Sequence, residues 1–184
     1  MTNEVLQATA SAGAEIVRGG GMAEVAEAHG FYTVECIGPD GEIRWTDTIE
    51  NLVTTAGKND ALDKYLAGSA YTAAWFLGLV DGGSAPTYAA ADTMASHSGW
   101  TEAVPYSNAT RPAPAFGAAA AGAKASTATA FNINATATVA GCFLASVNAK
   151  SGTTGILYSC GSFAGGNKAV TSGDTLNVTY TASL

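Results

Sequence analysis

Polar and apolar residues alternate along several short segments in the second half of the chain. From Asp174 to Ala182, the residues Leu176, Val178 and Tyr180 occupy one face, and threonines with one asparagine occupy the other. A period of two residues is typical of a β-strand with one buried face. The same kind of pattern, interrupted by glycines, predicts further strands over Thr127–Ile133, Thr138–Val147 and Gly155–Phe163.

A β-hairpin is predicted nearer the start of the chain. Phe31–Ile37 and Glu42–Ile49 flank the sequence Gly38-Pro39-Asp40-Gly41, whose residues favour a tight turn. In the second of these strands the apolar residues share one face, and Asp47 interrupts their pattern. We therefore expect two antiparallel neighbours that fold together as a local unit.

One helix is predicted, over Gly57–Gly68. Leu62, Tyr65 and Leu66 are spaced i, i+3 and i+4, which places them on one face of a helix. Gly68 stands where a helix commonly ends on a left-handed glycine. The apolar stripe is expected to hold the helix against the β domain.

The segment that follows the helix is apolar without alternation. Ala73–Val80 is a nearly continuous apolar run, which predicts a central strand with both faces covered, one of them by the helix. Trp100–Tyr106 is expected to form a short strand. Gly117–Ala125, a low-complexity run, is expected to be a connection.

These segments predict a mainly β protein: an antiparallel β-sandwich, jelly-roll or immunoglobulin-like, with one short helix and a flexible N-terminal arm. A sandwich needs apolar residues on the inner face of both sheets. The residues expected to form most of the core are Trp75, Phe76, Leu77, Leu79, Phe131, Ile133, Phe143, Leu144, Leu157, Leu176, Val178 and Tyr180.

Residues 1–30, here called the N-terminal arm, differ from the rest. They are rich in alanine, glycine and glutamate and contain Gly19-Gly20-Gly21, so they are expected to be flexible in isolation and to form no core of their own. The chain is thus expected to divide into the arm and a β-sandwich domain over 31–184. The apolar residues of the arm are the predicted partner-binding residues: Val5, Leu6, Ile16, Val17 and Met22.

Charge and composition narrow the function classes. Only 12% of the residues are charged, and the formal net charge of −7 is carried by the first half, since Asp174 is the only acid after Glu102. Nucleic-acid binding would need clustered lysines and arginines, which the sequence lacks. No apolar run is long enough to span a bilayer, and no basic secretory leader opens the chain, so we expect a protein kept in the cytoplasm where it is made.

The reactive residue types are scarce and scattered. Cys36, Cys142 and Cys160 have no metal-ligand spacing and are expected to be reduced, apolar-like side chains. No catalytic residue, cofactor site or metal site is predicted, because general acid–base chemistry requires convergent titratable groups. Asp81, Asp92 and Asp174 are each next to glycine or threonine, as turn residues are.

Two groups of residues suit either a functional or a structural role. His97 lies near Asp92, Ser96 and Ser98, which are the residue types of a hydrolase triad, but no nucleophile-elbow sequence accompanies them. A loop histidine with a local hydrogen bond is the preferred interpretation. The three tryptophans, at positions 45, 75 and 100, suit a sugar-binding groove, but their strand context favours core packing.

Several blocks resemble structural proteins of tailed bacteriophages. They are 50–59 (ENLVTTAGKN) with 62–66 (LDKYL), 75–80 (WFLGLV), 91–102 (ADTMASHSGWTE), 106–112 (YSNATRP) and 172–176 (SGDTL). The resemblance extends over residues 31–184, in this order, and leaves the arm outside it. It implies a virion component made in the host cytoplasm, and it is most like a capsid decoration (cement) protein.

From this resemblance we expect a non-enzymatic component that decorates and stabilises the capsid exterior through the arm and lattice-like contacts. The expected partners are the major capsid protein and further copies of the chain, as a homotrimer, with neither nucleic acid nor membrane. The alternative is a tail or fibre component involved in host attachment. A carbohydrate-active or protease-like enzyme is a third interpretation, which the missing carboxylate pairs disfavour.

Overall fold

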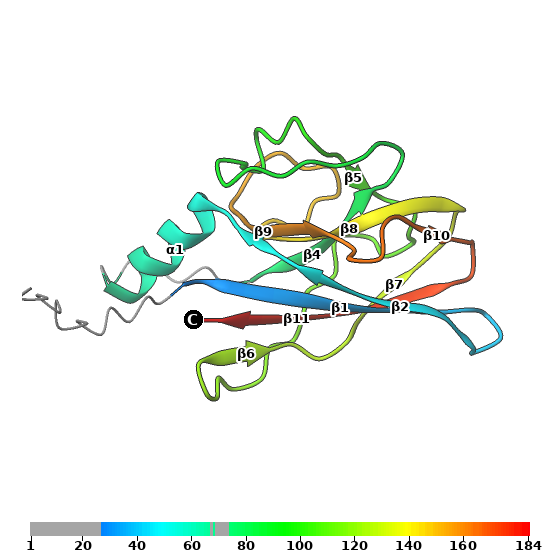
Figure 1. Ribbon diagram of the computed structural model, residues 1–184, viewed down its shortest axis with the longest axis horizontal. Coiled ribbons are helices and arrows are strands. Elements are labelled where there is room, and N and C mark those ends of the chain that lie inside the picture. Colours follow the sequence, from blue (N-terminus) through cyan, green and yellow to red (C-terminus); the bar gives the residue numbers. More distant parts are fainter. Residues whose placement is uncertain (1–26, 67, 69–73) are drawn as a thin grey trace, which may run out of the picture.

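The part of the chain that the structure describes folds into two antiparallel β-sheets that face each other, with one helix at one end (Figure 1). The computed structural model describes residues 27–66, 68 and 74–184. The first sheet has the order β2 (Ile43–Glu50), β1 (His29–Ile37), β11 (Thr175–Ser183), and β6 (Ala123–Ala125) and β7 (Thr129–Asn132) share the far edge of β11. The predicted antiparallel β-sandwich is confirmed.

The second sheet is built around the longest apolar strand. Its order is β3 (Leu52–Val53), β9 (Leu157–Ser162), β8 (Ala137–Ala145), β4 (Phe76–Asp81) and β5 (Glu102–Ala103), and β10 (Lys168–Val170) pairs with the first residues of β8. The chain passes from the first sheet to the second directly after β2.

The main core lies between the two sheets and follows the alternation in the sequence. Tyr32, Val34 and Cys36 of β1 are buried, as are the three apolar residues of β11, while the intervening residues face outward. Ten of the twelve predicted core residues are buried, and Trp75 and Phe76 are half-buried at the start of β4. The alternation in the sequence therefore predicted the inner face of the first sheet correctly.

A second apolar cluster lies on the other face of the second sheet. It contains Val80 of β4 and Phe143 of β8, and Met94 and Trp100 from the loop over residues 82–101 pack on it. Strand β4 is thus central and covered on both faces, as predicted. The cover on the outer face is this loop and not the helix, so that part of the prediction is wrong.

Gly78 of β4 shows how closely Phe143 of β8 packs on the outer face of the second sheet. It lies opposite Phe143 in the β4–β8 pair, and a Cβ atom added at Gly78 would meet the Phe143 ring at 2.1 Å. A phenylalanine ring therefore fills the space over a glycine in the neighbouring strand, an arrangement known to stabilise glycine in sheets.

Helix α1 (Thr55–Leu66) packs by a different face from the predicted one. Gly57 is buried against β9, where an added Cβ would lie 2.6 Å from the Tyr158 carbonyl oxygen. The side chain of Thr54 accepts a hydrogen bond from the Gly57 N–H at 3.1 Å and so caps the helix N-terminus. The helix approaches the sheet through backbone contact at its first turn.

The predicted apolar stripe of the helix does not hold it to the domain. Leu62, Tyr65 and Leu66 are 55%, 88% and 72% exposed. The inward side beyond Gly57 carries Asp60 and Lys64, which form an ion pair at 3.3 Å. Periodicity identified a helix with an apolar face, but the core was already filled by the two sheets, and the apolar face points away.

Several boundaries also differ from the sequence predictions. The 117–125 connection contains β6, which pairs with the end of β11. The strand expected over 100–106 is only two residues long. Strand β1 begins at His29, which pairs with Ser183, so the last two residues of the predicted arm belong to the sheet. Gly68 has the predicted left-handed backbone, with φ of 64°.

Candidate functional site

The most deeply buried ion pair among the described residues joins Arg111 and Glu102. Arg111 donates from Nε and Nη2 to the two carboxylate oxygens of Glu102, at 2.9 and 2.7 Å. The side chains are 1% and 6% exposed. A paired guanidinium and carboxylate in this planar arrangement make the strongest ordinary hydrogen bonds in proteins.

Arg111 and Glu102 also form hydrogen bonds with the backbone of the loop after β8. Arg111 donates to the carbonyl oxygens of Val147 and Gly152, and Glu102 accepts from the Ser151 N–H at 2.6 Å. The guanidinium also lies 5.0 Å from the centre of the Phe143 ring. The pair thus ties the segment before residue 111 to the loop after β8.

His97 does not form a triad. Its Nδ1 lies 3.0 Å from the carbonyl oxygen of Trp100, and its ring stacks on the indole at 4.0 Å between centroids. Asp92 accepts from Trp100 Nε1 at 3.2 Å. Both residues therefore bind Trp100 and not each other, which confirms the preferred interpretation of a loop histidine with a local hydrogen bond.

A cavity of about 230 Å³ lies between this tryptophan and the ion pair, and His97, Glu102 and Arg111 line it together. It is the nearest that the described residues come to a chemical site. Glu102 and Arg111 already hold each other and the surrounding backbone, so the cavity presents no free acid–base pair. The pairing was missed at the sequence level because residues 102 and 111 show no periodicity or motif; the scarcity of charged residues was the only signal.

The predicted turn acids have their predicted roles. Asp81 accepts from the Gly83 N–H at 2.9 Å, and Asp92 accepts from the Ala89 N–H at 3.1 Å. Asp174 is 3% exposed and accepts from both the N–H and the hydroxyl of Thr171. Each carboxylate closes a local loop, and none of them meets another acid.

The three cysteines all lie in the described part of the chain and are free, buried thiols. Burial, reinforced by the charge of Asp174, raises the pKa of Cys36 to about 11, and burial with a smaller effect of Asp92 raises the pKa of Cys160 to about 12. Burial also raises the pKa of Cys142. Thiolate is the reactive form of cysteine, so these side chains serve as packing groups.

The tryptophans do not line a common groove. Trp45 packs on Phe163, Trp75 on Tyr158, and Trp100 on Phe143. Across residues 27–66, 68 and 74–184, histidine, cysteine and carboxylate side chains do not gather in groups of three that could hold a metal ion. The helix found among those residues is too short and too polar to cross a bilayer.

The outer face of the first sheet is a broad polar surface. Thr48, Thr33 and Thr179 lie side by side across β2, β1 and β11, and Thr46, Glu35 and Asn177 form the next row. These residues line a shallow hollow of about 460 Å³. In these two rows, Glu35 is the one charged residue, so the hollow is lined mainly by neutral polar side chains.

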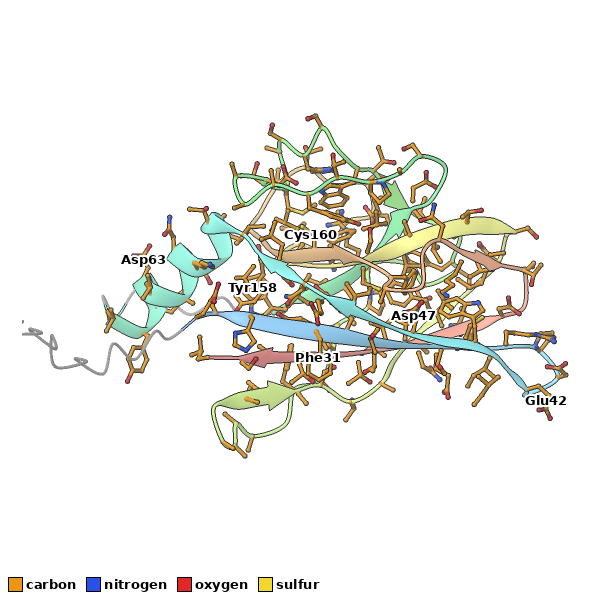
Figure 2. All side chains as sticks on the ribbon, viewed as in Figure 1. Phe31, Glu42, Asp47, Asp63, Tyr158 and Cys160 are labelled. Atoms are coloured by element: carbon orange, nitrogen blue, oxygen red, sulfur yellow. The ribbon has the colours of Figure 1, made fainter. Side chains whose placement is uncertain are left out.

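The second surface feature is apolar and lies at one end of the sandwich. Leu62, Tyr65 and Leu66 of α1, with Leu184 at the C-terminus, are all more than half exposed; they are called the apolar end here. Figure 1 shows α1 and the C-terminus at the same end, opposite the β1–β2 turn. Figure 2 shows Tyr158 beside the helix and Glu42 at the far end.

The apolar end surrounds a groove of about 500 Å³. Its walls are Lys58, Ala61, Leu62 and Tyr65 of α1, Tyr158 of β9, the C-terminal Leu184, and Glu27 with Ala28, where the arm joins the sheet. The predicted partner-binding residues Val5, Leu6, Ile16, Val17 and Met22 lie outside the described residues. Sequence reasoning placed the stripe of α1 in the core and so missed this surface.

No protein-family model and no curated protein matches the chain. The likeness to phage structural proteins therefore rests on the sequence blocks alone.

Proposed function

We propose that the protein is a non-enzymatic structural component of a tailed-phage particle that decorates and stabilises the exterior of the capsid. The observation that carries the proposal is the apolar end. Four large apolar side chains are exposed there beside Glu27, the first described residue of the chain. Exposed apolar patches of this kind on soluble proteins usually mark interaction sites.

The arrangement of charge and polarity supports attachment rather than turnover. The ion pair of Arg111 and Glu102 is fully engaged in holding loops. The outer face of the first sheet offers rows of threonines with few charges. A sandwich with one apolar end and one broad polar face can contact a shell and its neighbours at the same time.

The proposed partners are the major capsid protein and further copies of the chain. On the particle, the apolar end contacts the shell together with the N-terminal arm and the 31–49 hairpin, and the C-terminal strands contact other copies in a homotrimer. Weak contacts repeated over a lattice give high occupancy because each bound copy raises the effective concentration of the next contact.

The test is the copy number and location of the protein in purified particles. Quantitative mass spectrometry should find it in a fixed, high ratio to the major capsid protein, and it should stay with heads when tails are removed. A few copies per particle that leave with the tails would contradict decoration and favour the tail or fibre alternative.

A further inference from the structure

The groove at the apolar end lacks an occupant among the residues that the structure describes. Leu62 and Tyr65 on one wall are 55% and 88% exposed, and Leu184 on another is 78% exposed. The groove is large enough, at about 500 Å³, to take several aliphatic side chains. Burial of such surface is favourable in proportion to the apolar area removed from water.

The position of the groove indicates which segment covers it. Glu27 and Ala28 form part of its wall. The segment of residues 1–26 is therefore attached to the rest of the chain at the groove itself. A tether of this kind keeps a segment at an effective concentration on the order of millimolar, far above that of a second copy in dilute solution.

The length of the segment allows it to fold back along the helix. Val17 is ten residues before Glu27, and ten residues reach about 33 Å when extended. The twelve residues of α1 span only about 18 Å. The sequence Gly19-Gly20-Gly21 lies between these points, and glycine can take the backbone conformations that a reversal needs without a side-chain penalty.

The chemistry of the segment fits the groove. Ile16, Val17 and Met22 supply aliphatic side chains of the kind that the walls would bury. Lys58 is an exposed cation on the groove wall, and the segment carries acids, Glu15 and Glu24 among them, against Arg18 as its one base.

We propose that residues 1–26 dock through Ile16, Val17 and Met22 into the groove between α1, Tyr158 and Leu184 of their own chain. The proposal concerns the free protein and holds whether or not the protein joins a particle. On a particle, the same residues would have to leave the groove to reach a neighbour.

A photo-crosslinker tests the contact directly in the full chain. A benzophenone amino acid replaces Tyr65, and in a control protein it replaces Ile43, which is 57% exposed at the far end of the sandwich. Equal amounts of isotopically light and heavy protein are mixed and irradiated. Peptide mapping then shows which segment is cross-linked and whether it comes from the same copy.

We expect position 65 to cross-link to residues 1–26 of the same copy, and position 43 to give no such product. Cross-links between light and heavy chains would assign the groove to a second copy and contradict the proposal. Cross-links to residues 67–73, or none to 1–26, would also overturn it.

Trypsin gives an independent readout because Arg18 is the one tryptic site before Arg44. A docked segment is cleaved only when it opens. Leu62→Asp removes an exposed groove contact, and cleavage after Arg18 should become about tenfold faster. Ile43→Asp, an equally exposed control, should leave the rate unchanged. Equal rates in Leu62→Asp and the unsubstituted protein would show that the segment is not held there.

Discussion

The buried pair of Arg111 and Glu102 should be the most sensitive polar contact in the fold. Replacing Arg111 by Met keeps an unbranched side chain but removes the guanidinium, whose N–H groups donate to Glu102, Val147 and Gly152. The Glu102 carboxylate would remain buried with the Ser151 N–H as its main partner. Leaving one charge of a buried pair without its partner costs about 3–5 kcal/mol of unfolding free energy.

An exposed pair in the same protein provides the matched control. Arg44 and Asp40 lie 3.0 Å apart, but their side chains are 45% and 50% exposed. Water and salt screen such a pair, so Arg44→Met should cost only about 0–1 kcal/mol. Urea unfolding, monitored by far-ultraviolet circular dichroism, gives both free energies of unfolding. The slope of the unfolding free energy against urea concentration should be the same in the variants and the unsubstituted protein.

A double substitution separates the charge from the packing. Glu102→Leu combined with Arg111→Met removes both charges, so the loss should be smaller than the sum of the two single losses by about 0.5–3 kcal/mol. If Arg111→Met cost no more than Arg44→Met, the ion pair would not hold the loops, and the structural role given to it here would be wrong.

Three further outcomes follow from burial and charge. Leu77→Ala should cost about 2–5 kcal/mol because Leu77 is fully buried, whereas Leu62→Ala should cost less because Leu62 is 55% exposed with respect to the other described residues. A disulfide reagent at pH 8 should detect none of the three cysteines in the folded protein and all three after unfolding, because burial raises their pKa, to about 11 for Cys36; rapid labelling of the folded protein would contradict this. For Asp47, burial opposes ionisation, but the ion pair with Lys168 and backbone donors lower its pKa below the ordinary 3.8. Asp47→Asn should therefore reduce stability at neutral pH, and the difference should shrink and disappear as the pH falls from the ordinary pKa of 3.8 through the lowered one; a difference that stayed the same from pH 5 down to pH 2 would refute the assignment.

The strands could be predicted because each carries its own periodicity. The alternation of Leu176, Val178 and Tyr180 gave the buried face of β11, and the turn at 38–41 gave the pairing of β1 with β2. Both signals are local in sequence. Very short strands such as β3 and β5 carry too few residues for any period, and they exist only because longer neighbours pair with them.

The orientation of α1 could not be predicted in this way. The Leu62–Leu66 stripe showed which face is apolar, but not whether the two sheets leave room for it. Gly57 decides the packing because only a residue without a side chain allows the helix to approach the Tyr158 backbone. A single glycine at the start of a helix gives no sign of that contact in the sequence.

The candidate surfaces also differ in whether a local sequence pattern predicts them. The polar face of β11 follows from its alternation, so that surface was open to prediction. The ion pair of Glu102 with Arg111 and the groove beside Leu184 depend on residues that the fold brings together from distant segments. No spacing rule relates those positions.

The most direct test of the central claim is an add-back experiment on phage particles that lack this protein. The full chain and a version that starts at Glu27 are added, and the bound copies are counted by mass spectrometry. The cut leaves β1 intact, since that strand begins at His29. We predict high occupancy for the full chain, somewhat weaker in high salt because acidic residues contribute, and much lower occupancy without residues 1–26. Equal occupancy of the two would contradict attachment through the arm, and no binding of either would contradict decoration itself.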